Sequence, residues 1–216
     1  MAVTRRTALL VGWMCLVLCQ ITVAAPVSSN ILIQNVLNAL RAQYESVNQT
    51  GTSVRARCVL QVNSDLADDV KVNNQVSGTL DFEQSSLGGT LRVSGTVSGI
   101  DPTSADLHGF HVHSSSDMSN GCTSTGGHFN PFGKNHGAPS DEERHVGDFG
   151  NVYQYQGNVD VSIQDHLASL VGDNSIIGKA IVLHKERDDL GTGGYSDSLT
   201  TGHAGARLAC CEIVAV

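Results

Sequence analysis

Short runs of alternating apolar and polar residues fill most of the chain from Val54 to its end, and this feature constrains the fold most strongly. A period of two places one face of each run in a core and the other in solvent, which is typical of β-strands. Glycine is abundant, with 23 residues, whereas proline is scarce, with 4. Eight strands with glycine-bearing turns predict an all-β, closed or sandwich-like barrel. The runs are residues 54–62, 76–82, 91–97, 110–113, 151–155, 159–163, 176–183 and 208–216.

Two stretches interrupt this rhythm, residues 114–150 and residues 185–206. Long irregular segments are uncommon in a compact domain and usually carry function. We therefore expect the functional residues to concentrate on these two loops.

The first 25 residues have the features of a secretory signal peptide. Arg5 and Arg6 precede an apolar stretch at residues 8–18, and the small residues Ala24 and Ala25 follow. The apolar run is shorter than the ~20 residues that a membrane-spanning helix needs, so a removable leader is favoured over an anchor. We expect cleavage after Ala24 and a secreted, extracellular protein.

The chain is acidic, with a formal net charge of −8 that becomes −10 once the leader and its two arginines are removed. This balance disfavours nucleic acid and anionic membranes as partners. Cysteines 58, 122, 210 and 211 remain after cleavage. An even number in an oxidising compartment permits disulfides without dictating their pairing.

Residues 26–52 differ from the rest of the chain and predict a short N-terminal amphipathic helix and a linker before the main domain, residues 53–216. Apolar residues recur at helical intervals, at Ile33, Leu37, Leu40, Tyr44 and Val47. These apolar residues span only about two heptads, too few to identify a coiled coil. The helix therefore either lies on its own domain or joins copies of the chain through residues 31–47.

Asn48 begins the sequence Asn48-Gln49-Thr50, an acceptor motif for N-linked glycans. In a secreted chain such a motif predicts a glycan at Asn48. A chance match of so short a motif is the alternative.

Five of the nine histidines crowd into the segment from residue 111 to residue 145. His111 and His113 are two apart in an expected strand, so both imidazoles project from one face. Six candidate imidazoles and one carboxylate exceed the four ligands of a structural zinc, which leaves two metals, or one metal and idle histidines. An all-imidazole set suits copper(II), and three histidines with an aspartate suit zinc. The candidates are His111, His113, His128, His136, His145, Asp148 and His184.

The motifs around these residues resemble the copper/zinc superoxide dismutase family in the same order from about Val54 to Val216. They are Gly109-Phe110-His111-Val112-His113, Gly127-His128-Phe129-Asn130-Pro131, Glu142-Glu143-Arg144-His145-Val146-Gly147-Asp148 and Gly205-Ala206-Arg207-Leu208-Ala209-Cys210. The resemblance implies an eight-stranded Greek-key barrel with two long functional loops. It also implies a homodimeric enzyme that converts superoxide to oxygen and hydrogen peroxide, with one copper that cycles between Cu(II) and Cu(I) and one structural zinc per chain.

The same resemblance implies a role for each site residue. Copper would be held by His111, His113, His128 and His184, and zinc by His128, His136, His145 and Asp148. His128 would bridge the metals and supply a proton, Asp188 would link His111 to His136, and Arg207 would attract the anion. A non-enzymatic extracellular metal-binding plasma protein is the alternative; it would be signalled by loss of a ligand or of Arg207, and neither is lost.

The resemblance further implies a disulfide between Cys122 and Cys210, with Cys211 as an alternative partner for Cys122. We expect Cys58, in the first strand, to be a buried free thiol. Adjacent strand residues point to opposite faces, so only one of Cys210 and Cys211 suits Cys122 at a time. The chain departs from the family at Thr200, where a lysine often helps to draw in superoxide.

Overall fold

The computed structural model describes residues 33–40 and 52–216. Residues 33–40 form a helix inside the segment for which the sequence predicts one. The leader, residues 1–25, and the acceptor Asn48 lie outside the described residues. Within those residues, no helix has the length and apolar character needed to cross a membrane.

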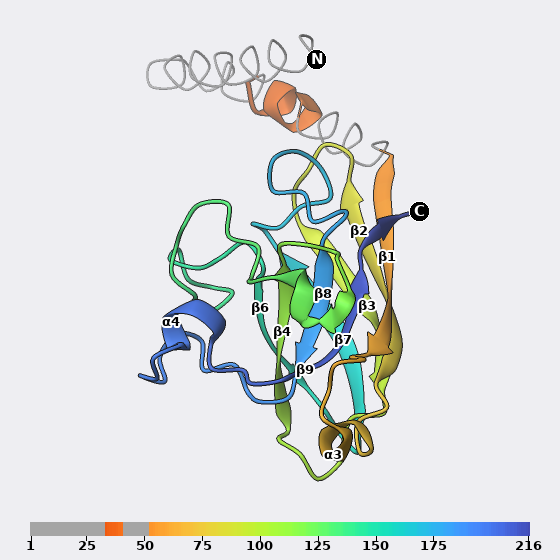
Figure 1. The fold of residues 1–216 in the computed structure, drawn as a ribbon. Helices are drawn as coiled ribbons and strands as arrows, with labels where there is room; N and C mark the ends of the chain where they lie inside the picture. The colour runs from red at the N-terminus through yellow and green to blue at the C-terminus, as the bar shows by residue number, and fades with distance from the viewer. Residues whose placement is uncertain (1–32, 41–51) are drawn as a thin grey trace. The chain divides into compact units, whose positions relative to one another are not determined.

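Residues 52–216 form a mostly β domain in which every pair of hydrogen-bonded strands is antiparallel (Figure 1). Eight strands follow one another around the barrel in the order β6-β4-β8-β9-β1-β2-β3-β7, and the short β10 pairs with β1. β6 and β7 end this order with no ladder between them in the described domain, so the barrel is nearly closed. The strands are β1 (Ser53–Val62), β2 (Ser77–Ser85), β3 (Leu91–Ser98), β4 (Leu107–His113), β5 (Ser119–Cys122), β6 (Asp148–Tyr153), β7 (Asn158–Asp165), β8 (Ala180–His184), β9 (Arg207–Glu212) and β10 (Val214–Ala215).

This arrangement confirms the predicted all-β barrel, and each of the eight predicted runs corresponds to one of the eight strands. Helical structure in the domain is limited to α3 (Asp68–Lys71), η1 (Thr123–Thr125) and α4 (Ser198–Thr201). Alternation works as expected in β1, where Ala56, Cys58 and Leu60 are buried and their neighbours are more exposed.

Alternation fails in β4 and β8, where nearly every residue is buried. The inner faces of these strands belong to the apolar core, which includes Phe110, Val112 and Leu183. Their outer faces are covered by the two long connections, residues 114–147 and residues 185–206. The covered outer face is therefore a protected place in which polar side chains can be held away from water.

Two disulfides cross-link the strands, and one of them corrects the sequence analysis. Cys122 bonds Cys210 as predicted, but Cys58 is not a free thiol, because it bonds Cys211. The physical reason lies in the strand alternation of β9. Cys210 faces the outer layer beside Cys122, whereas Cys211 belongs to the interior cluster that contains Cys58. Cys211 is thus not an alternative partner for Cys122.

Candidate metal centre

The strand β4 divides its side chains between the core and the metal centre. Phe110 and Val112 pack inside the barrel. His111 and His113 project from the opposite face and are almost completely buried, at 0% and 1% exposed. The shared face predicted for these two imidazoles is therefore correct.

The remaining candidate ligands come from three other parts of the fold. His128, His136 and His145 lie on the long connection after β5, Asp148 begins β6, and His184 ends β8. A backbone bridge pairs His128 with His113 and so holds the connection against β4. The seven predicted ligands form two buried groups that share His128: one is His111, His113, His128 and His184, and the other is His128, His136, His145 and Asp148.

In the second group, three imidazole nitrogens converge on one carboxylate oxygen. Asp148 Oδ1 lies 2.8 Å from His128 Nδ1, 2.9 Å from His136 Nδ1 and 3.1 Å from His145 Nδ1. Ligands of a tetrahedral zinc with bonds of about 2.0 Å are about 3.3 Å apart. The other oxygen, Oδ2, accepts hydrogen bonds from the backbone N–H groups of His145 and Gly137, which fixes the carboxylate. This donor set fits zinc.

The first group offers four imidazoles and no carboxylate. His113 Nε2 and His184 Nε2 are 3.3 Å apart, and the ring centroids of His111 and His128 are 4.1 Å apart. His111 Nδ1 and His128 Nε2 are buried without a hydrogen-bond partner among the described residues. Buried polar nitrogens are normally satisfied, so these two atoms fit the positions of copper ligands.

His128 belongs to both groups through different nitrogens. Its Nδ1 faces Asp148 in the zinc group, and its Nε2 faces the copper group. One imidazole can therefore bridge the two metals.

The outer nitrogens of the other histidines contact protein acceptors, which selects the tautomer and the ring orientation of each ligand. Asp188, which is fully buried, lies between the two groups. Its Oδ2 is 2.9 Å from His111 Nε2, and its Oδ1 is 2.8 Å from His136 Nε2. Backbone carbonyls serve the rest: Gly126 O contacts His113 Nδ1, Gly205 O contacts His184 Nδ1, and Lys134 O contacts His145 Nε2.

Sequence reasoning missed the residues that support these contacts. Asn151 makes two hydrogen bonds to the backbone of Asp188, at 2.9 and 2.8 Å. Arg144 is buried, pairs with Asp165 at 2.6 Å and donates to the backbone carbonyl of Asp148. Both residues stand inside or close to a recognised motif, but the sequence does not reveal which distant backbone group each one contacts.

The electrostatic environment prepares the copper ligands to bind as neutral rings. Burial and the neighbouring His128 lower the pKa of His184 to about 3, and the same two causes hold the pKa values of His111 and His113 well below the ordinary range. The zinc group behaves differently. Burial lowers the pKa of His136, but hydrogen bonds with Asp148 and Asp188 outweigh it and raise the pKa to about 9.

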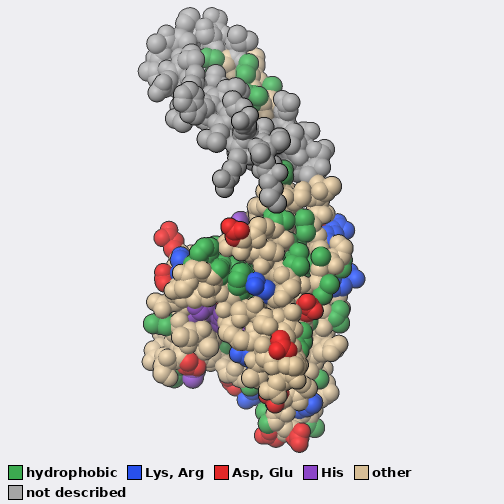
Figure 2. Space-filling model, turned by 45° about the horizontal axis from the view of Figure 1, so that its top comes forward, with side chains coloured by type: hydrophobic (Ala, Val, Ile, Leu, Met, Phe, Trp, Pro, Cys, Tyr) green, Lys and Arg blue, Asp and Glu red, His purple; other side chains and the backbone are tan. Residues whose placement is uncertain are grey.

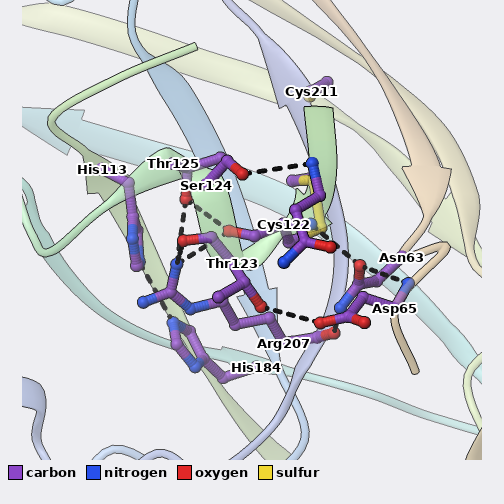
Figure 3. Close-up of a disulfide and its surroundings, with 12 residues drawn as sticks. Asn63, Asp65, His113, Cys122, Thr123, Ser124, Thr125, His184, Arg207 and Cys211 are labelled. Atoms are coloured by element: carbon purple, nitrogen blue, oxygen red, sulfur yellow. Dashed lines mark hydrogen bonds between the residues drawn. A yellow bond between two sulfur atoms is a disulfide. The ribbon is translucent and has the colours of Figure 1, made fainter. Parts of the chain in front are cut away.

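Arg207 begins β9 and extends beside the copper group (Figure 3). Its Nη1 donates to Cys122 O at 2.7 Å, to Thr123 O at 3.3 Å and to Thr125 Oγ1 at 3.1 Å. Its charge contributes to the lowered pKa values of His113 and His184. Figure 3 shows the guanidinium next to these two histidines.

The three remaining histidines of the barrel stand apart from both groups. His108 is buried, and its Nδ1 lies 3.0 Å from the carbonyl oxygen of His184. His166 contacts Thr90 at the surface. His203 is exposed, pairs with Asp197 at 2.7 Å and stacks on Tyr195. None is a ligand in either group.

Comparison with known proteins matches the copper/zinc superoxide dismutase (SODC) family to residues 76–213, more than half of the chain. The chain belongs to this family. Copper/zinc superoxide dismutases of Yarrowia lipolytica and Candida albicans are 52% and 51% identical over 139 and 142 residues, which cover 64% and 65% of this chain and 89% and 91% of the relatives. An extracellular superoxide dismutase of Caenorhabditis elegans is 49% identical over 144 residues, 66% of this chain and 63% of that protein.

Membership and geometry agree on the activity and the cofactors. The chain is a copper/zinc superoxide dismutase with an intact copper site of four histidines and an intact zinc site of three histidines and an aspartate. A non-enzymatic relative with a degraded site would lack at least one metal ligand. All seven ligands are present here.

Proposed function

We propose that this dismutase works outside the cell, that Arg207 guides superoxide to the copper site, and that His128 relays a proton there. The observation that carries the proposal is the position of the Arg207 guanidinium beside His113 and His184. When bound, copper supplies the one-electron couple by which two superoxide anions and two protons become oxygen and hydrogen peroxide. Zinc has no accessible redox state; bound by His128, His136, His145 and Asp148, it would keep these side chains in place.

The attraction for superoxide has to be local, because the chain as a whole is acidic. On the face shown in Figure 2, acidic and basic side chains are scattered over the domain rather than gathered by sign. Thr200, on α4, adds no charge. Arg207 Nη1 is occupied by three oxygens, so its other N–H groups remain to orient an anion beside His113 and His184.

His128 is the residue suited to hold a proton between the two half-reactions. Its Nδ1 is directed at the zinc group, so Nε2 is the atom that can take up and release a proton on the copper side. Burial lowers the pKa of His128, although hydrogen bonding to Asp148 opposes this effect. Nε2 is therefore the atom from which a proton would pass to the second superoxide.

Replacement of Arg207 tests the guidance role. Arg207→Gln should lower the second-order rate constant strongly, measured by pulse radiolysis, while metal analysis still finds one copper and one zinc per chain. Thr200→Lys should raise the rate at low ionic strength and lose the gain as salt screens charges beyond ~8 to 10 Å. An Arg207→Gln enzyme with the wild-type rate would show that other groups guide the anion.

An extracellular location is supported by two disulfides, which persist in oxidising compartments, and by the extracellular relative from C. elegans. Protein collected from the medium of expressing cells should begin at Ala25, after removal of the leader, and should carry a glycan at Asn48. Terminal sequencing and a mass shift on glycosidase treatment test both points. Retention of the whole chain inside the cell would contradict the proposal.

A homodimer is supported by an apolar groove of about 370 Å³ lined in part by Val59, Met118, Val214 and Val216. Its three valines are 50–73% exposed, and a second copy of the chain would remove them from water. A tetramer formed through residues 31–47 is the further assembly that we propose.

A further inference from the structure

Asn63 is a buried amide at the end of β1 that no part of the metal chemistry explains. Its side chain is held among three chain segments and is only 5% exposed. Nδ2 donates to the backbone carbonyl of Arg207 at 2.8 Å. Oδ1 accepts from the backbone N–H of Cys122 at 2.8 Å and from that of Asp65 at 3.1 Å. The amide thus ties Arg207 to the segment that carries Cys122.

The side chain of Arg207 returns to the same segment. Its Nη1 donates to Cys122 O, so Asn63, Arg207 and Cys122 form a closed ring of three hydrogen bonds (Figure 3). Asp65 adds a contact from the same turn, accepting a hydrogen bond from Thr123 Oγ1 at 3.1 Å. The Asn63 side chain therefore holds the Arg207 backbone directly, and it holds the Arg207 guanidinium indirectly, through Cys122.

The disulfide between Cys122 and Cys210 does not duplicate this function. A disulfide limits the distance between two backbones, but rotation about its side-chain bonds leaves the direction of nearby carbonyl groups less restricted. The Asn63 amide binds the N–H of the residue whose carbonyl receives Nη1. It therefore restricts the orientation of that acceptor as well as its distance.

We propose that Asn63 is a positioning residue for Arg207, setting where the guanidinium lies beside the copper ligands His113 and His184. The inference rests on the proposed role of Arg207 in binding the anion. A displacement of about 1 Å in such a group is enough to weaken a reaction step substantially. Loss of the amide would let both the Arg207 backbone and the 122–125 segment shift while every metal ligand stays in place.

Azide binding to the copper- and zinc-loaded enzyme tests the proposal without relying on turnover. Azide is a small anion that binds Cu(II), and its affinity follows from titration of the charge-transfer absorption. Asn63→Ala removes all three side-chain hydrogen bonds, two of which hold Arg207 and Cys122, and should weaken azide binding about threefold to tenfold with metal content unchanged. In an Arg207→Ala background the same substitution should have no further effect, because the guanidinium that Asn63 positions is gone.

Asn74→Ala is the matched control. Asn74 is 3% exposed and its side chain makes two hydrogen bonds, to Val70 O and from the Asp101 N–H, but it contacts neither Arg207 nor the 122–125 segment. Asn74→Ala should destabilise the protein and leave azide affinity unchanged.

Asn63→Asp keeps the acceptor for Cys122 and loses the donor to Arg207, and it carries the test if Asn63→Ala does not yield folded, metal-loaded enzyme. The Arg207-dependent weakening of azide binding should be smaller in Asn63→Asp than in Asn63→Ala.

Two results would overturn the inference: unchanged azide affinity in the Asn63 variants, or an equal loss with and without Arg207. If Arg207→Ala itself left azide affinity intact, the guidance role would fail, and this inference with it. A clear effect of Arg207→Ala with no effect of the Asn63 variants would sink only the inference.

Discussion

At the scale of single residues, the metal centre depends on giving each imidazole two different partners. In every ligand except the shared His128, one nitrogen faces a metal site and the other faces Asp188 or a backbone carbonyl. Since these outer acceptors lie on separate segments, the rings are held in position before any ion binds. Small changes close to the outer acceptors should therefore affect the metals without touching a ligand.

Gly202 is one such position. It follows α4 with φ +64°, and a Cβ there would overlap Asp188 Oδ1 and approach His136 Nε2 to 2.5 Å. Gly202→Ala should separate Asp188 from His136 and weaken zinc binding at least tenfold, since supporting residues of this kind typically contribute 10- to 100-fold in affinity. Competition with a chelator measures the change. Gly194→Ala is the control, because it shares a positive φ but has open space around it; equal zinc affinity in both variants would contradict the argument.

The raised pKa of His136 predicts a pH dependence for zinc uptake by metal-free protein. The proton on His136 is retained up to about pH 9, compared with 6.5 for an ordinary histidine, and zinc has to displace it. Its contribution to the stability of metal-free protein is fully present below pH 6.5 and is lost as pH rises through about 9. Zinc affinity should rise across the same window.

Zinc titration with an indicator dye for released protons measures this dependence. Asp188→Asn removes one of the two carboxylates that hold the proton on His136. The pH range over which zinc affinity rises should therefore move to lower pH in this variant. Zinc affinity that does not change between pH 6.5 and 9 would contradict the assignment.

At the scale of elements, the two long connections build the site and the cross-links hold them. The disulfide between Cys122 and Cys210 joins the end of β5 to β9, next to Arg207, whereas that between Cys58 and Cys211 joins β1 to β9 inside the barrel. The two bonds therefore stabilise different features, although their cysteines on β9 are adjacent.

Paired substitutions should separate the two functions. Cys122→Ala with Cys210→Ala should lower both the thermal midpoint and the rate per copper, because the 122–125 segment also holds Arg207. Cys58→Ala with Cys211→Ala should lower the midpoint alone. The chain-entropy model gives a stabilisation of roughly 4 to 5 kcal/mol for each disulfide, because the entropy lost on closing a loop depends only weakly on loop length. Equal rate losses in both pairs would show that the inner disulfide also shapes the channel.

At the scale of the whole molecule, the proposed dimer rests on apolar side chains that a single copy leaves in water. Val59 lines the apolar groove, and a charge there should oppose association. Val59→Glu should reduce the mass in solution from dimer to monomer by light scattering, and Val72→Glu, at an exposed valine outside the groove, should not. Deleting residues 26–50 should separately reduce a tetramer to a dimer. An unchanged mass on deletion would favour a helix that lies on its own barrel.

Local sequence was sufficient for those features of this protein that depend on short spacing. Alternation with a period of two identifies strands such as β1, which have one buried and one exposed face. The ligand motifs identify the metals because donor type and number restrict the choice of ion. Both kinds of information lie within a few neighbouring residues.

The tertiary structure decided whatever depends on which distant segments meet. Adjacent cysteines 210 and 211 share a sequence context, but they face opposite sides of β9, and only the barrel shows that Cys58 lies opposite the inner one. Asn63 and Asn151 look like ordinary polar residues in sequence, and their partners lie 144 and 37 residues away. Such contacts are set by the closure of the barrel and the path of two long connections, because a hydrogen bond depends on distance in space and leaves no periodic trace along the chain.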